Sequence, residues 1–467
     1  MLSDDILFLP VTELSRRVRS RQISPVELAQ SYLERSRTIG QRLNAYVTLT
    51  EELALQQARA AEKEIAAGKY RGPLHGIPYA AKDLLALKGY PTTWGARPYA
   101  NQGFDYDATV IQKLNAAGAV LIGKAAMIEL AGGMGYRFAS ASATGPAKNP
   151  WNTNCWTCGS SSGSGAIMAA GLAAFALGTE TWGSIICPSG FSGVSGLRPT
   201  FGRVSRYGAM ALAYSMDKIG PLCRTAEDCD LVLQTISGHD ARDLGSLPDA
   251  AARYAGSARA NGALRLGWMT NQWTKPSPDV EQAVSAARKV LEAEHSFTIK
   301  EIKLPEGPWE VAAGVVVSVE GASAFRSLID SGRVLELNDP LGKIGGFMNQ
   351  EISASDFLLA QRIRGILQKK MAELFAQVDV LVAASLPVTA TTLDTNLDDA
   401  LSFSDPIGGI GNFCGLPAIS VPCGFGHQGT PVGLQFVGAP LGDAKIVQAA
   451  RLFQSRTNWH TRRPKVT

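Results

Sequence analysis

The sequence predicts an α/β protein in which helices cover a buried sheet. Helical and strand patterns alternate along the chain, as expected of this class. For example, a helical run ends at Gly118 and an apolar strand pattern over residues 119–122 follows at once. The chain has 467 residues, of which 45% are apolar and 18% charged. This composition provides enough apolar surface for one large core or two ordinary ones.

The first 70 residues predict a helical layer. Ser24 is suited to cap a helix, with Pro25 at the first helical position and Glu27 in the first turn. A later alanine-rich run with many polar residues ends at Gly68, a residue typical of a helix C-cap. We expect residues 1–70 to pack as one layer on the rest of the chain.

Later segments predict buried strands and the helices that cover them. The apolar run ending at Lys82 predicts a strand, and residues 166–177 predict a buried core helix. Residues 277–294 and 355–375 have the patterns of helices that cover a sheet. Residues 305–352 give mixed signals, and we expect a lid or a pocket wall there. Further strands are expected in the runs VDVLVAAS, GLPAISVP and PVGLQFVG.

Charge and cysteine content argue against several classes of function. The 45 basic and 41 acidic residues are nearly balanced and form no block of like charge, so binding to nucleic acid or membranes is not indicated. The N-terminus starts acidic and has no secretion-signal pattern. Seven cysteines, an odd number, are typical of free thiols in a reducing compartment. We therefore expect a cytoplasmic protein.

The sequence predicts no metal site. Cys155 and Cys158 have CxxC spacing, but no second pair of cysteines or histidines completes a zinc site. The five histidines are far apart and form no ligand pattern. We expect neither a metal nor a cofactor.

The glycine- and serine-rich segment 159–165 fits three kinds of site. A phosphate loop needs a lysine after its last glycine, and a dinucleotide fingerprint needs a preceding strand; neither is evident here. The segment also contains G-x-S-x-G around Ser161, the pattern of a hydrolase nucleophile elbow, for which His427 could serve as the base. Pro150 and Asn154 disfavour the strand that such an elbow requires.

The third interpretation uses two serines and a lysine. Ser160 and Ser184 are both flanked by glycines, and a serine needs a base before it can attack a carbonyl. Lys82 ends an apolar run, so burial would lower the pKa of its amine and allow it to accept a proton. The ordinary alternative is a lysine that pairs with an acid at the surface.

Several segments in this order resemble the amidase-signature hydrolases. They are HGIPYAAKDLL, NPWN to CGSSSGSGA, GTETWGSIICPSGFSGVSGLRPTFGRVSRYG, DKIGPLCRTAEDCDLVL, GLPAISVP and PVGLQFVG. The resemblance covers most of the chain except about residues 240–352. It implies a large mixed, mostly parallel sheet between helical layers. Residues 71–467 would form the signature domain, and the whole chain one structural unit.

The resemblance also implies roles for particular residues. Ser184 would be the nucleophile, Ser160 a bridging serine after a cis peptide bond, and Lys82 the base. Ser184 would form an acyl-enzyme, which water then hydrolyses. The negative charge that develops on the carbonyl oxygen would be bound by the backbone N–H groups of Thr181, Trp182, Gly183 and Ser184.

The chain departs from the family pattern beside the nucleophile. Glu180, Trp182 and Ile186 stand where the family usually has aspartate, glycine and arginine. If Ile186 faces the site, the loss of the cation favours a neutral substrate; alternatively, the change lies in the core. Gly132 and Met134 lie in a loop with which the family contacts acyl groups, and they are further candidates for substrate binding.

We therefore expect a hydrolase that cleaves the C–N bond of a neutral, apolar or aromatic amide, anilide or carbamate, with esterase activity also possible. The resemblance supports a second interpretation, the A subunit of a tRNA-dependent amidotransferase, which hydrolyses glutamine only with a partner subunit. The altered nucleophile segment suggests a third, a binding protein without catalysis. The predicted partner is a small-molecule amide or carbamate, and the sequence leaves the oligomeric state open.

Overall fold

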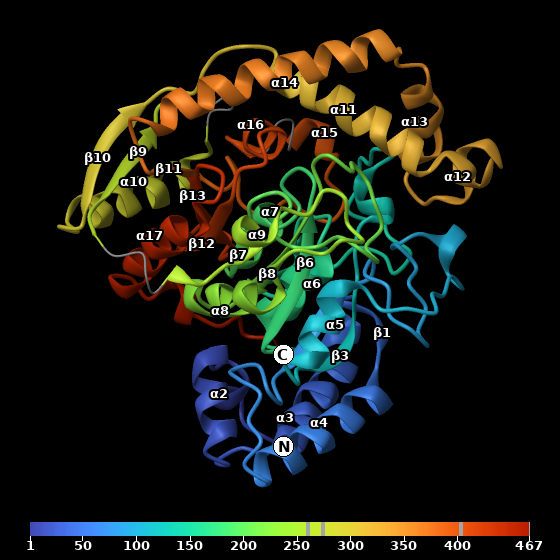
Figure 1. Ribbon diagram of the computed structural model, residues 1–467, viewed down its shortest axis with the longest axis vertical. Coiled ribbons are helices and arrows are strands. Elements are labelled where there is room, and N and C mark those ends of the chain that lie inside the picture. The colour runs from blue at the N-terminus through green and yellow to red at the C-terminus, as the bar shows by residue number, and fades with distance from the viewer. Residues whose placement is uncertain (258–261, 272–275, 401–404, 467) are drawn as a thin grey trace.

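A computed structural model describes residues 1–257, 262–271, 276–400 and 405–466. Its centre is an 11-stranded sheet in the order β1-β3-β2-β6-β8-β7-β12-β13-β11-β9-β10. Helices lie on both sides of this sheet (Figure 1). The strands are β1 (Tyr46–Leu49), β2 (Pro78–Lys82), β3 (Val120–Ala125), β6 (Phe175–Glu180), β7 (Ser195–Arg198), β8 (Lys218–Cys223), β9 (Leu264–Met269), β10 (Phe297–Ile302), β11 (Val380–Ala384), β12 (Ala418–Phe425) and β13 (Pro431–Gly438).

The sheet is mixed and lies between helical layers, as expected. Parallel pairs join β3 to β2 and β2 to β6 at one end, and β11 to β9 and β9 to β10 at the other. The strands between these two groups pair in antiparallel fashion, from β6 through β8, β7, β12 and β13 to β11. Parallel pairing is therefore confined to these two groups of strands.

The N-terminal residues lie as a layer at the opposite end of the molecule from α14 (Ala354–Phe375) in Figure 1. Ser24 caps α3 as expected, because its side chain accepts hydrogen bonds from the backbone N–H groups of Val26 and Glu27. The layer is not wholly helical, since β1 joins the edge of the sheet by pairing with β3. Its helices are α1 (Asp4–Leu7), α2 (Val11–Arg19), α3 (Pro25–Arg35), a π-helix (Ser36–Gly40) and α4 (Glu51–Ala66).

Residues 305–352 form helices of which α11 packs beneath the long helix α14, while α12 and α13 pack against α11 (Figure 1). The glycine-rich KIGGF run lies inside one of these helices, α13, rather than at a tip. A Cβ atom at Gly345 would lie 1.9 Å from the carbonyl oxygen of Met134, so α13 touches the 130–138 loop closely. This contact supports the expectation that residues 305–352 form a wall, which here covers the 130–138 loop. The helices are α11 (Trp309–Ala324), α12 (Arg326–Asp330) and α13 (Pro340–Gln350).

The remaining helices pack around the sheet. The strands and helices expected around residues 277–294, 355–375 and 380–438 are all present. These remaining helices are α5 (Thr109–Ala116), α6 (Ser162–Ala170), α7 (Ile186–Ser192), α8 (Ala226–Ile236), α9 (Asp249–Ala252), α10 (Pro278–Glu292), α15 (Leu397–Ala400), α16 (Gly408–Phe413) and α17 (Asp443–Ser455).

Two local predictions were wrong. The expected core helix over residues 166–177 ends at Gly171, which has a left-handed φ of 64°, and its last residues belong to β6. A glycine in that conformation ends a helix readily because it has no Cβ. Residues before the serine-rich segment, expected as loop, form β5 (Asn152–Trp156), which pairs with β4 (Lys148–Asn149) outside the main sheet.

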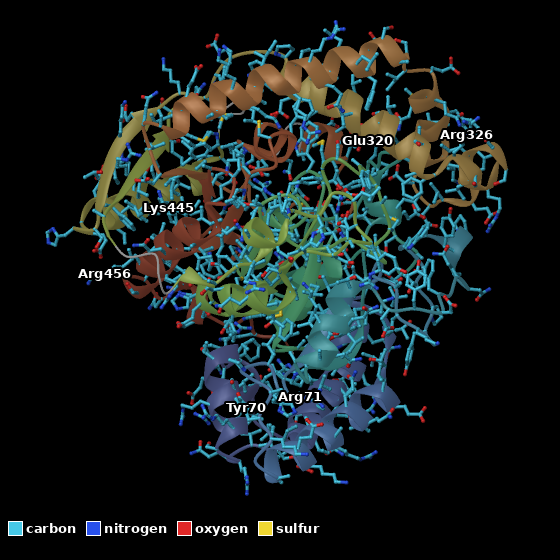
Figure 2. The ribbon with its side chains drawn as sticks, in the orientation of Figure 1. Tyr70, Arg71, Glu320, Arg326, Lys445 and Arg456 are labelled. Carbon is cyan, nitrogen blue, oxygen red and sulfur yellow. The ribbon has the colours of Figure 1, made fainter. Side chains whose placement is uncertain are left out.

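Charged side chains are spread over the outside of the molecule, as Arg71, Lys445 and Arg456 illustrate (Figure 2). Several of them form surface ion pairs; the Lys445 ammonium lies 2.8 Å from the Asp379 carboxylate. All seven cysteines carry free thiols. Among the described residues, no helix is long and apolar enough to cross a membrane.

Candidate active site

Lys82 is the last residue of β2 and is completely buried. Its ammonium nitrogen lies 2.7 Å from the hydroxyl oxygen of Ser160, 2.9 Å from that of Ser161 and 2.9 Å from that of Thr179. The neighbouring strand β6 supplies Thr179. The structure therefore brings together two of the predicted residues, Lys82 and Ser160, which are 78 positions apart in the chain.

Burial lowers the pKa of Lys82 to about 7, although the charges of Asp217 and Glu180 oppose this shift. Desolvation disfavours the charged form of an amine, and the three neighbouring hydroxyl groups carry no charge to compensate for it. A large share of Lys82 side chains is therefore neutral near pH 7. A neutral amine has a lone pair and can accept a proton, as the sequence-based interpretation requires.

The hydrogen bonds around Lys82 favour Ser160 as its proton donor. A neutral amine offers two N–H groups and one lone pair, so one of its three hydroxyl neighbours must donate to it. The Ser161 hydroxyl can donate instead to the carbonyl oxygen of Thr179, 3.2 Å away. Ser160 is the nearest of the three. The Ser160 hydroxyl can then donate its hydrogen bond to Lys82, and the lone pairs of the Ser160 oxygen remain free to accept one.

Crowding around Gly159 places Ser160 at this position. The Gly159–Ser160 peptide bond is cis, as the family resemblance implied. A Cβ atom at Gly159 would lie 2.6 Å from Ile128 and 3.0 Å from Trp156, so no larger residue fits there without movement. The backbone N–H of Ile128 also donates a hydrogen bond to the carbonyl oxygen of Ser160.

Ser184 lies in the turn between β6 and α7, and its side chain is 7% exposed. Gly183 has a φ of 80°, in the left-handed region that favours glycine. Within the described part of the chain, no hydrogen bond joins the hydroxyl groups of Ser160 and Ser184. The four N–H groups predicted to bind the oxyanion donate no hydrogen bond to any described residue, so they are free to bind an oxygen atom. They belong to Thr181, Trp182, Gly183 and Ser184.

Glu180 anchors the turn that carries Ser184, which the sequence did not predict. Its carboxylate accepts hydrogen bonds from the backbone N–H groups of Ile185 at 2.7 Å and Ile186 at 2.9 Å. It also forms a completely buried ion pair with Arg198, at 2.5 Å. Burial opposes ionisation, but Arg198 and the backbone donors hold the pKa of Glu180 at about 2. The family usually has aspartate at the position of Glu180, so the sequence indicated an acid here. It did not indicate the partner of this acid, because Arg198 lies too far along the chain.

The predicted substrate-binding residues lie in different surroundings. The Ile186 side chain is completely buried in the main core, which supports a change within the core rather than in a pocket. Met134 is 2% exposed and lies beneath α13. Gly132 lies beside Tyr136. Trp182 is partly buried against the core and has no positive φ, so its backbone does not require the family's glycine.

Other residues considered from the sequence do not assemble into a site. Ser161 is completely buried and bonded to Lys82, and the backbone N–H of Thr179 donates to its hydroxyl oxygen. His427 is mostly exposed, and its Nδ1 lies 2.6 Å from a carboxylate oxygen of Asp279 instead. Among the residues that the structure describes, no group of His, Cys, Asp or Glu could hold a metal ion. The geometry thus favours Lys82 and Ser160 over an elbow at Ser161.

Residues 27–447 match the family model named Amidase. This match covers most of the chain, and the protein therefore belongs to the amidase family.

Individual relatives differ in what they act on. The A subunit of glutamyl-tRNA(Gln) amidotransferase from Cupriavidus necator is 37% identical, with 97% of both chains covered. The structure of peptide amidase from Stenotrophomonas maltophilia has a TM-score of 0.84 at 28% identity, covering 97% of this chain and 98% of that chain. The A subunit of glutamyl-tRNA(Gln) amidotransferase from Thermotoga maritima has a TM-score of 0.81 at 26% identity, with 100% of both chains covered.

Proposed function

We propose that the protein hydrolyses an amide C–N bond through an acyl-enzyme on Ser184. The observation that carries this proposal is the buried Lys82, whose pKa is lowered to about 7 and which is hydrogen-bonded to Ser160. A buried lysine with no acidic partner in contact is costly to maintain in a fold. A role as a general base would explain why the protein keeps a buried lysine at this position.

In the proposed reaction, Ser184 attacks the substrate carbonyl carbon and its proton passes through Ser160 to Lys82. The free N–H groups of residues 181–184 bind the oxyanion, and removing one such donor typically costs about 2.7–4 kcal/mol of transition-state stabilisation. The proton then returns through Ser160 to the leaving nitrogen as the C–N bond breaks. Water attacks the acyl-enzyme by the same proton path and releases the acid.

The substrate has two candidate classes. Whole-chain similarity to the Cupriavidus necator relative favours glutamine, hydrolysed as the A subunit of an amidotransferase together with partner subunits. The surroundings of the serines favour a neutral amide, anilide, carbamate or ester. A second apolar cluster next to them includes Trp156, Cys158, Cys187 and Phe191. Either substrate would be a small molecule, and a cytoplasmic location remains our prediction.

Serine labelling tests the proposal. We expect a fluorophosphonate to label the purified protein and the Ser184→Ala variant to lose both the label and all amidase activity. A protein that binds ligands without catalysis would take up no label. Activity of the lone chain on simple amides would favour the neutral-amide class. Glutaminase activity that appears only with partner subunits would favour the amidotransferase.

A further inference from the structure

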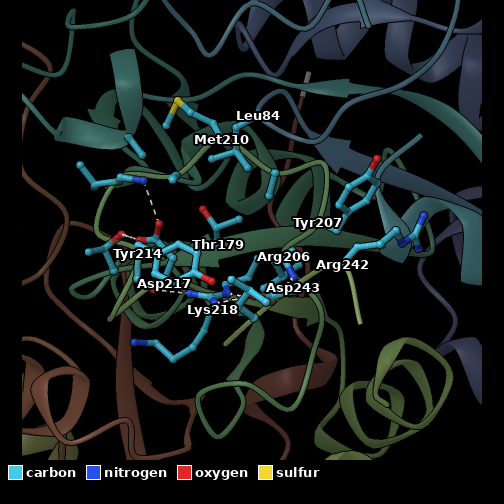
Figure 3. A pocket seen from close by; sticks show the side chains of 17 residues that line it. Leu84, Thr179, Arg206, Tyr207, Met210, Tyr214, Asp217, Lys218, Arg242 and Asp243 are labelled. Atoms are coloured by element: carbon cyan, nitrogen blue, oxygen red, sulfur yellow. Dashed lines mark hydrogen bonds and ion pairs between the residues drawn. The ribbon is translucent and has the colours of Figure 1, made fainter. Parts of the chain in front are cut away.

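A cavity of about 210 Å³ adjoins the proposed active site (Figure 3). Thr179 and Thr181 of the nucleophile segment line it, together with Ala131 of the 130–138 loop. The Thr179 hydroxyl oxygen lies 2.9 Å from the Lys82 nitrogen. One wall of the cavity is therefore a single hydrogen bond away from the proposed base.

Apolar and aromatic side chains form much of the cavity wall. Figure 3 shows Leu84 and Met210 on one side and Tyr207 on another. Tyr214 is 49% exposed and marks the side that is open to solvent. A ring or a branched alkyl group would therefore exchange water for apolar contacts on entering.

The charged groups toward the mouth of the cavity are already paired. Arg206 is 8% exposed, and its guanidinium donates to both carboxylate oxygens of Asp243, at 2.7 and 3.0 Å. Arg242 donates to both carboxylate oxygens of Asp240, at 2.9 and 3.1 Å. Its guanidinium also lies 4.2 Å from the ring centre of Tyr207. Neither arginine has its charge free for a substrate carboxylate.

The inner charged groups are also engaged. Asp217 accepts hydrogen bonds from the Thr181 hydroxyl and from the backbone N–H of Leu212. The Lys218 side-chain nitrogen donates to the carbonyl oxygen of Met216, and burial holds the pKa of Lys218 well below its usual value, which disfavours its charged form. A substrate carboxylate placed here would lose its hydration without gaining an unpaired cation, because both arginines are paired and the pKa of Lys218 is lowered.

We propose that this cavity binds an uncharged aromatic or branched aliphatic group joined to the scissile amide. The inference rests on the proposed amide hydrolysis. An apolar cavity of about 150 Å³ can hold benzene, so a cavity of about 210 Å³ accommodates a phenyl ring with a small substituent. Glutamine carries a carboxylate, which finds no unpaired cation among the arginines of this wall. The ring belongs to either the acyl or the amine half of the substrate.

Four amides test this specificity in the wild-type protein. Acetamide has no ring, acetanilide has a ring on nitrogen, benzamide has a ring on the carbonyl, and 4-acetamidobenzoate adds a carboxylate to acetanilide. We expect kcat/KM for at least one uncharged ring amide to exceed that for acetamide by at least about tenfold. The preferred ring amide identifies the half of the substrate that enters the cavity. 4-Acetamidobenzoate and L-glutamine should be poorer substrates than that amide.

Filling the cavity tests its location. Ala209 lines the cavity and is partly buried, so Ala209→Leu adds a side chain where the ring is expected. This variant should lower the ratio of kcat/KM for the ring amide to that for acetamide by at least about tenfold. Ala444→Leu is the matched control, because Ala444 is also partly buried but lies in α17, outside the cavity. The control should leave the ratio unchanged.

A binding measurement separates this inference from the proposed reaction. Calorimetry with Ser184→Ala protein should show acetanilide or benzamide binding that Ala209→Leu weakens at least about tenfold. This result would support the cavity even if the wild-type protein hydrolysed no amide, which would overturn the proposed function alone. Equal binding and an equal ratio in a folded Ala209→Leu variant would overturn the cavity assignment. So would faster hydrolysis of 4-acetamidobenzoate than of acetanilide.

Discussion

At the scale of single residues, Lys82 shows how burial changes the chemistry of a side chain. The sequence indicated only that this lysine ends an apolar run. In the fold its nitrogen meets three hydroxyl groups and no acid, so desolvation dominates and lowers its pKa to about 7. The spacing of the serines indicated Ser160, but Thr179 and Ser161 were missed as partners of Lys82, because threonines and serines at strand and helix ends are common.

The pH dependence of the reaction follows from this lysine. Its neutral form accepts the proton, so kcat/KM should rise from pH 6 to pH 8 with an apparent pKa of about 7 and level off above it. Lys82→Ala should lower kcat/KM by about 10²–10⁴-fold and remove this dependence. Initial rates on one ring amide, measured in buffers of equal ionic strength, provide the check. A flat profile between about pH 5.5 and pH 8.5 would show that another group accepts the proton.

At the scale of elements, the turn from β6 to α7 is held by a carboxylate at the end of β6. Glu180 is the last residue of β6, and its Oε2 accepts hydrogen bonds from the two N–H groups at the start of α7. Arg198 at the end of β7 and Asn412 in α16 bind the same carboxylate. Four separate segments therefore meet at Glu180 and hold the Ser184 turn.

Removing this charge should destabilise the fold strongly. Glu180→Gln leaves the completely buried Arg198 without its partner, and breaking a buried ion pair typically costs about 3–5 kcal/mol. Glu13→Gln is a matched control, because Glu13 pairs with Arg16 at the surface and such pairs contribute about 0–1 kcal/mol. Urea unfolding followed by circular dichroism measures both losses. Similar losses for the two variants would mean that Glu180 contributes little to the turn.

Element boundaries were predicted well where local chemistry decides them. Ser24 caps α3 through its own side chain, and β2 ends at Lys82 as its apolar pattern indicated. The segment from residue 166 to residue 177 was mistaken for one helix because its residues are apolar throughout. Periodicity cannot separate a buried helix from a buried strand, and Gly171 marks the change between them.

At the scale of the whole molecule, two buried acids lie where α11 meets the segment that leads into α16. Glu310 of α11 packs against Gly409 of α16, and Asp405 lies just before that helix. Burial and the charge of Asp405 raise the pKa of Glu310 to about 7, and burial raises the pKa of Asp405 to about 6. One oxygen of each carboxyl group has no hydrogen-bond partner among the described residues.

This arrangement makes stability depend on pH. A raised carboxyl pKa favours the protonated form in the folded state, so its contribution is present at low pH and is lost as pH rises through about 7. Glu310→Gln removes the charge at every pH. The variant should match the wild type near pH 4.5 and exceed its free energy of unfolding by about 3 kcal/mol at pH 8.

Urea unfolding at several pH values provides the measurement. Glu306→Gln is the control, because Glu306 is exposed in the segment just before α11. This control should change stability little at any pH, since substitutions of exposed residues usually change the free energy of unfolding by no more than about 0.5 kcal/mol. Parallel stability curves for the wild type and Glu310→Gln would show that folding does not raise the pKa of Glu310.

The sequence by itself determined the family motifs, the strand that ends at Lys82, and the serine and glycine segments around residues 160 and 184. These features depend on residues close together in the chain. Only the tertiary structure decided that Lys82 meets Thr179, 97 positions away, and that Ile186 faces the core. It also decided that Glu180 pairs with Arg198 and that the arginines lining the cavity are paired with aspartates. Burial and desolvation depend on neighbours distant in sequence, so local patterns cannot specify them.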